Sequence, residues 1–186
     1  MKRKVTIGLI VIATTLLTYG LIRYVGVLGF LFAWVLNLLL MTCVFIFTET
    51  LKSDLSSGYY REKKWERNGK LYENLGINFF RKVLVWIGWE KLNKKSNPVK
   101  NDPQDLNLLE YRTKQSELGH LIILFVVFGF SLFVAIEYGA KEAIWLIALN
   151  IILNLYPILL QRYNRPRIQK AIRVSNSREK RLSKTV

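Results

Sequence analysis

The residues best suited to acid–base chemistry are Glu117 and His120, in the segment Glu117-Leu118-Gly119-His120. His120 is the only histidine in the chain, and histidine changes its charge near neutral pH. A spacing of three places both side chains on one face of a helix, where a carboxylate bonded to one imidazole nitrogen raises the basicity of the other. The pair predicts a general base, although a polar helix cap at a membrane boundary would use the same residues. One Glu-x-x-His offers only two metal ligands, whereas carboxylate-bridged dimetal bundles use two such motifs, so we expect no metal.

A second candidate site is the segment of residues 161–167, with three arginines within six residues: Gln161, Arg162, Tyr163, Asn164, Arg165, Pro166 and Arg167. Guanidinium groups bind phosphate and carboxylate through paired hydrogen bonds, so the segment predicts an anion site. Arginines that extend from a membrane span toward water are the simpler interpretation. Lysine would serve equally for that purpose, and the segment contains none. We expect Pro166 to stop one helix or to start another.

Two further polar positions are candidates. Asn154 lies four residues after Asn150, and Pro157 follows it. Amides in lipid need hydrogen-bond partners, and a proline leaves a carbonyl one turn earlier without its donor. Asn154 is therefore predicted either to bridge helices or to line, with Tyr156, a cavity below the arginines. Glu66 is either a second carboxylate at the site or part of a solvated charged turn.

The composition indicates the environment in which these residues work. Hydrophobic residues make up 51% of the 186-residue chain, yet 28 Lys and Arg against 13 Asp and Glu give a formal charge of +15. This combination fits apolar residues in lipid and basic residues at an anionic leaflet, and we expect no nucleic-acid partner. Cys43 is the single cysteine, so an internal disulfide is excluded.

Four apolar blocks predict an all-α integral membrane protein with about four spans, at residues 5–21, 25–47, 120–136 and 143–160, within a single membrane domain of residues 1–174. Of the 28 basic residues, 26 lie outside the two short connections between spans, which contain only Arg23 and Lys141. Positive residues remain in the cytoplasm. We therefore expect both termini and the central segment to be cytoplasmic, in a multi-pass protein of the cell membrane.

The central segment is predicted to contain an amphipathic helix at residues 71–92. Its apolar residues recur at helical spacing, at Leu75, Phe79, Val83 and Trp86. Arg81 and Lys82 argue against a span; the alternative is a shallow re-entrant hairpin broken near Gly76 or Gly88. A basic tail at residues 175–186 is expected to be disordered.

On these residues the chain resembles the glycosyl-4,4'-diaponeurosporenoate acyltransferases (CrtO type) of bacterial carotenoid biosynthesis. Three stretches carry the resemblance in order: residues 66–70 (Glu-Arg-Asn-Gly-Lys), residues 113–120 (Thr-Lys-Gln-Ser-Glu-Leu-Gly-His), and residues 154–157 followed by 161–167. The last stretch, Gln-Arg-Tyr-Asn-Arg-Pro-Arg, is the most specific. The resemblance covers about residues 60–173 and the N-terminal hairpin only loosely.

The resemblance implies a membrane acyltransferase that moves a fatty acyl chain to a sugar hydroxyl of a glycosylated carotenoid or related glycolipid. Its partners would be membrane lipids, a lipid-anchored sugar acceptor and an acyl donor such as acyl-CoA, with no tightly bound cofactor. His120 would be the base and Glu117 would orient it. The expected binding residues are Gln161, Arg162, Tyr163, Asn164, Arg165, Arg167, Asn154 and Glu66. Since we find no serine or cysteine placed as a covalent nucleophile, we expect direct transfer.

Two other functional classes remain open on the sequence. A non-enzymatic lipid carrier or assembly protein would use the same basic residues for anionic lipid. An integral methyltransferase also keeps arginines after its last span, but it would need a nucleotide-cofactor pocket, and no Gly-rich loop suggests one.

Overall fold

The computed structural model describes residues 2–88 and 102–182. In these two ranges the chain forms helices joined by short connections and contains no strand. Four helices are long and apolar enough to cross a membrane: Lys2–Val25, Gly29–Leu51, Pro103–Glu137 and Ile144–Arg181. The predicted all-α membrane fold is therefore confirmed. The described chain separates into two compact units, Met1–Asp54 with Gln115–Ile158 (unit 1) and Leu55–Lys114 with Leu159–Val186 (unit 2).

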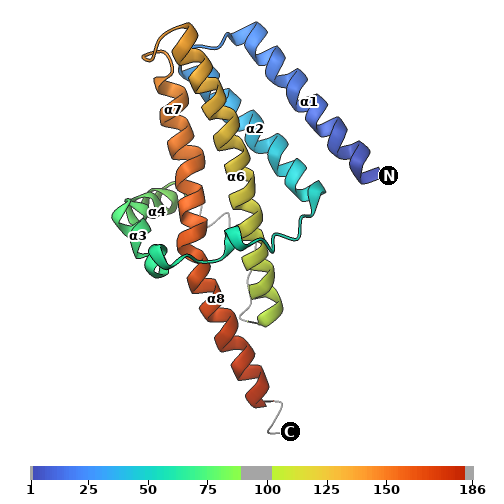
Figure 1. Ribbon diagram of the computed structural model, residues 1–186, viewed down its shortest axis with the longest axis vertical. Coiled ribbons are helices and arrows are strands. Elements are labelled where there is room, and N and C mark those ends of the chain that lie inside the picture. Colours follow the sequence, from blue (N-terminus) through green and yellow to red (C-terminus); the bar gives the residue numbers. More distant parts are fainter. Residues whose placement is uncertain (1, 89–101, 183–186) are drawn as a thin grey trace. The chain divides into compact units, whose positions relative to one another are not determined.

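Unit 1 contains α1 (Lys2–Val25), α2 (Gly29–Leu51), the C-terminal part of α6 (Pro103–Glu137), α7 (Ile144–Asn150) and a π-helical segment (Ile151–Leu155) (Figure 1). The 24 residues of α1 extend over about 36 Å, enough to cross the ~30 Å hydrocarbon core of a bilayer. Gly26 and Gly29 have φ of +83° and +80°, a conformation open to glycine. They form the short turn that lets α2 pack back against α1.

The core of unit 1 is an apolar stripe on α2 packed against α6 and α7. Side chains at spacings of three and four line one face of α2, as an amphipathic packing surface requires. The buried set is Leu21, Phe32, Ala33, Leu36, Leu40, Val44, Ile123, Val127, Val134, Ala143, Leu146 and Leu149. The outer side chains of α1, such as Leu9, Ile12 and Leu16, are exposed in the chain itself. Lipid is the environment that suits such a surface.

Unit 2 contains the connection after α2 and the polar ends of two helices. Its elements are the 3₁₀ turns η1 (Gly58–Tyr60) and η2 (Lys64–Gly69), the helices α3 (Lys70–Asn74) and α4 (Ile77–Trp86), the N-terminal part of α6, and α8 (Tyr156–Leu182) from Leu159 onward. Unit 2 contains 22 of the 28 basic residues and unit 1 contains the other six. The basic character of the chain therefore belongs mainly to unit 2.

The structure differs from the expected single helix at residues 71–92. The helix is interrupted at Gly76, whose φ is +80°, and the two parts are α3 and α4. Only glycine adopts this conformation without strain, so the chain turns there. The described helix ends at Trp86, and residues 89–92 lie outside the described part of the chain.

The region around Pro166 also differs from expectation, because α8 continues through this proline. Pro166 removes a single backbone donor from the helix. The helical turns before and after Pro166 maintain α8. Helix α8 then runs to Leu182, so residues 175–182 are helical rather than disordered. Arginine and lysine are good helix formers and suit a helix C-terminus. Residues 183–186 lie outside the described part of the chain.

Candidate active site

His120 lies at the centre of a buried polar cluster in unit 1. Its Nδ1 is 3.4 Å from Oδ1 of Asn154. The amide nitrogen of Asn154 donates to Oδ1 of Asn37 at 2.7 Å and to Oδ1 of Asn150 at 2.9 Å. Asn37 and Asn154 are fully buried and Asn150 is nearly so. The cluster connects α2, α6, α7 and the π-helical segment, so the bridging predicted for Asn154 is present.

The backbone around Asn154 departs from a regular α-helix. Residues 151–155 are π-helical, and the N–H of Tyr156 bonds the carbonyl of Ile151. Pro157 has no N–H, so it cannot donate the hydrogen bond that the Leu153 carbonyl would receive in an α-helix. Single π-helical turns occur frequently at functional sites, and this turn presents Asn154 to the imidazole of His120.

Glu117 is fully buried on α6, one turn before the partly buried His120. The hydrogen bond that the structure gives for the imidazole joins it to Asn154. The orienting role expected of Glu117 therefore stays a prediction. Sequence reasoning missed Asn37, although an amide within an apolar block was a signal, because intramembrane polar residues are costly and tend to be functional.

In unit 2, Glu66 is a buried carboxylate with three donors. Its Oε1 accepts hydrogen bonds from Nη1 of Arg162 and from the hydroxyl of Tyr72, both at 2.7 Å. Its Oε2 accepts from the backbone N–H of Lys63 at 2.9 Å. Only 3% of Glu66 is exposed. Glu66 is thus the anchor of the η2 turn and the counterion of Arg162.

The pKa of Glu66 reflects a balance between burial and these donors. Burial alone raises the pKa, but the hydrogen bonds from Lys63, Tyr72 and Arg162, with the charge of Arg162, outweigh it and hold the pKa below its ordinary value. Burial raises the pKa of the Tyr72 hydroxyl, and its bond to the carboxylate raises it further. Glu66 is therefore an ionised hydrogen-bond acceptor at neutral pH.

The arginines of residues 161–167 contact groups of unit 2. Nη2 of Arg162 donates to the carbonyl of Tyr59. The guanidinium carbon of Arg162 also lies 4.4 Å from the centre of the Tyr59 ring. Arg165, 2% exposed, donates to the carbonyl of Tyr60 at 3.2 Å. Arg167 stands 3.7 Å from the centre of the Tyr163 ring. The cation–π contact and hydrogen bonds of Arg162 and Arg165 hold α8 against the connection after α2, whereas the contact of Arg167 with Tyr163 lies within α8.

Gly69 lies at the contact between the turn of residues 66–69 and the arginine segment of residues 161–167. A Cβ on Gly69 would lie 3.1 Å from Nη1 of Arg167 and 3.3 Å from Tyr163, and its φ is +89°. The turn of residues 66–69 therefore packs tightly on residues 162–167. Glu73 adds to this contact, because it accepts from the Tyr163 hydroxyl at 3.2 Å and from Nη2 of Arg167 at 3.3 Å. Gln161 and Asn164 are partly buried on α8 beside them.

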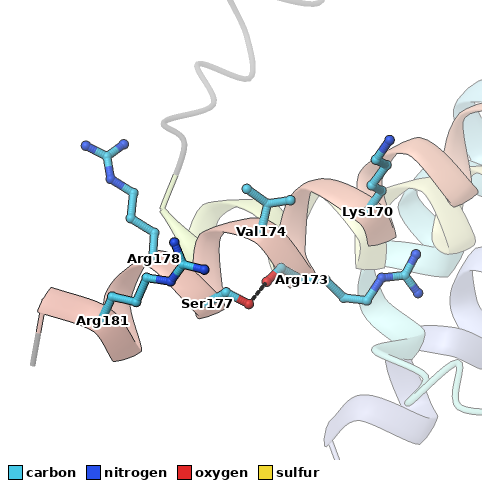
Figure 2. Close-up of a pocket in the computed structure, with 6 residues that line it drawn as sticks. All are labelled: Lys170, Arg173, Val174, Ser177, Arg178 and Arg181. Carbon is cyan, nitrogen blue, oxygen red and sulfur yellow. Dashed lines mark hydrogen bonds between the residues drawn. The ribbon is translucent and has the colours of Figure 1, made fainter. Parts of the chain in front are cut away.

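A basic groove of about 410 Å³ lies along the C-terminal half of α8. Its lining residues recur at helical spacing and are Lys170, Arg173, Val174, Ser177, Arg178 and Arg181. Figure 2 shows the long basic side chains extending from the helix, with the Ser177 hydroxyl donating to the Arg173 carbonyl. Four cationic side chains on one face favour an anionic ligand or surface.

Comparison with known proteins identifies the family. A family model described as glycosyl-4,4'-diaponeurosporenoate acyltransferase matches residues 56–174. The chain belongs to this family. The matched range contains His120, Asn154, Glu66 and the arginines, and the suspected resemblance is confirmed. No curated protein and no solved structure is significantly similar to the chain.

Membership makes the chain a membrane acyltransferase at the level of the family. The chemistry available in unit 1 is proton transfer at His120, since an imidazole held by an amide can accept a proton at its other nitrogen. In residues 2–88 and 102–182, no group of three His, Cys, Asp or Glu side chains could hold a metal ion. The groups in unit 2 offer positive charge and hydrogen-bond donors.

Proposed function

We propose that the chain transfers a fatty acyl chain to a sugar hydroxyl of a glycosylated carotenoid or related glycolipid, at the cytoplasmic face of the cell membrane. The observation that carries the proposal is a single imidazole held by buried amides in unit 1, in a family named for acyl transfer to a glycosylated acceptor. The distribution of basic residues supports the cytoplasmic side.

In the proposed reaction, His120 removes the proton of the acceptor hydroxyl as its oxygen attacks the acyl carbonyl of a thioester. A C–O bond forms, the C–S bond breaks, and the imidazolium returns the proton to the leaving thiolate. Glu117, one turn earlier on α6, orients the imidazole and stabilises its charged form. General-base help contributes about 10²–10⁴ in rate, so His120 carries much of the proposed acceleration.

The donor is acyl-CoA in this proposal, and its phosphates contact unit 2. Arg162 and Arg165 are buried against groups of the chain itself, whereas 47% of the Arg167 side chain is exposed. We therefore assign the phosphate contact to Arg167, with Asn164 and Gln161 as neighbouring donors. The groove along α8 would contact anionic headgroups, each basic residue contributing about 1 kcal/mol near a membrane surface.

The test is transfer by the purified chain in lipid vesicles that contain a glycosylated carotenoid, with radiolabelled acyl-CoA as donor. Wild type should form acylated product, and His120→Ala should form it about 10²–10⁴-fold more slowly. Arg167→Lys should raise KM for acyl-CoA, since it keeps the charge but loses the planar fork. Arg61→Lys, on an exposed arginine of unit 2, is the matched control. No acylated product with wild type, or equal rates for wild type and His120→Ala, would contradict the proposed acyl transfer.

A further inference from the structure

The amides on either side of Asn154 have their orientations determined by backbone carbonyls. Nδ2 of Asn37 donates to the carbonyl of Ala33 at 2.8 Å, and Nδ2 of Asn150 donates to the carbonyl of Leu124 at 3.0 Å. A carbonyl can only accept a hydrogen bond, so the nitrogen of each amide must face it. The oxygens of Asn37 and Asn150 therefore both face Asn154.

Two oxygens that face Asn154 determine how its own amide lies. Its Nδ2 has two hydrogens, and these donate to Asn37 and Asn150. Its Oδ1 is then the atom 3.4 Å from Nδ1 of His120. Since an amide oxygen only accepts, Nδ1 of His120 must carry the hydrogen.

A neutral imidazole has one N–H and one lone pair. With the hydrogen on Nδ1, the lone pair is on Nε2.

We infer that Asn154 is a positioning residue, which holds His120 in the Nδ1–H tautomer so that Nε2 is the atom that accepts the proton. This inference rests on the proposed function for its catalytic meaning. Asn37 and Asn150 act one step further away by orienting Asn154. Asn37 lies on α2, before the matched residues 56–174, so the N-terminal hairpin contributes to the site.

The direct test is ¹⁵N NMR of the full chain, labelled with ¹⁵N-histidine and placed in lipid nanodiscs. The chain has one histidine, so with an affinity tag that contains none the spectrum reports one imidazole. In the pH range where the ring is neutral, wild type should show a protonated Nδ1 and an unprotonated Nε2. A protonated Nε2 with an unprotonated Nδ1 would overturn the inference, and this result needs no variant.

Asn154→Ala removes the acceptor at Nδ1. Its spectrum should shift toward the Nε2–H form, and kcat should fall about 10–100-fold, the usual effect of losing a residue that orients a ligand or base. Thr42→Ala is the control, because Thr42 is an exposed residue of α2 whose hydroxyl bonds only its own helix; its spectrum and kcat should equal those of wild type. An unchanged spectrum in folded Asn154→Ala would overturn the inference.

The spectrum and the enzyme assay separate two kinds of failure. If wild type shows the Nδ1–H form but transfers no acyl chain, the proposed function fails and the assignment of the tautomer stands. If wild type transfers acyl chains but shows the Nε2–H form, the inference about Asn154 fails and the proposed function stands.

Discussion

Glu66 and Arg162 form a salt bridge with both side chains buried, 4% and 10% exposed. Removing one partner of such a pair leaves a buried charge without compensation, at a cost of about 3–5 kcal/mol. We expect Glu66→Gln to lower the free energy of unfolding by about 3 kcal/mol, the lower end of this range. The loss is not larger because Arg162 keeps its contacts with the carbonyl and the ring of Tyr59. The free energy of unfolding of the full chain in detergent, compared between wild type and variant, measures the loss.

The control for this change is Glu179→Gln, on an exposed glutamate of α8. It should alter stability by less than about 0.5 kcal/mol, as surface substitutions usually do. Equal stability of the Glu66 and Glu179 variants would contradict the anchoring role of Glu66.

The pKa of Glu66 also predicts a dependence on pH. Folding lowers this pKa below its ordinary value of 4.5, so the unfolded chain binds the proton more readily. The stabilisation is complete above the ordinary pKa and disappears as the pH falls through the lower folded value. The stability difference between wild type and Glu66→Gln should therefore be constant near neutral pH and shrink on acidification below pH 4.5. A difference that grew on acidification would contradict this account.

At the residue scale, the sequence identified His120, Asn154, Glu66 and the arginines by type and spacing. It could not identify their partners. Asn154 bonds a residue 117 positions away, and Arg162 bonds one 96 positions away. Such contacts depend on how helices pack, which local periodicity does not encode. The resemblance grouped Glu66 with the arginine segment, and the structure gives the physical reason, an ion pair between them.

At the scale of elements, the turn of residues 66–69 is conformationally constrained, because Arg67, Asn68 and Gly69 all have positive φ. Gly69→Ala would introduce a left-handed conformation for alanine and a Cβ 3.1 Å from Arg167. We expect a loss of about 1–3 kcal/mol. Gly58→Ala is the matched control, because a Cβ there meets nothing within 4 Å and its φ is not positive. Thermal unfolding should separate the two variants, and equal midpoints would contradict the packing described for Gly69.

Apolar length predicted the four spanning helices well, since ~20 apolar residues have few other stable structures in lipid. The breaks within and between elements were harder to predict. A proline interrupts the hydrogen bonds of a helix without always ending it, as α8 shows at Pro166. The π-helical turn before Pro157 has no signal of its own beyond that proline and the buried amides.

At the scale of the whole molecule, the basic residues predict the orientation in the membrane. In a Cys43→Ser background, which removes the only native cysteine, we expect a Lys141→Cys variant to react with a membrane-impermeant maleimide in intact cells. An Arg3→Cys variant should react only after the cells are permeabilised. The opposite pattern would contradict cytoplasmic termini and would place the proposed reaction on the other face.

The central claim is that the chain acylates a membrane glycolipid through His120. Its most direct test is mass spectrometry of lipids and pigments from cells that lack the gene, and from the same cells restored with wild type, His120→Ala or Thr42→Ala. We predict that a glycosylated precursor lacking one acyl chain accumulates without the gene. Wild type and Thr42→Ala should clear it, and His120→Ala should not. An unchanged lipid profile in cells that express the protein, or full clearance by His120→Ala, would contradict the claim.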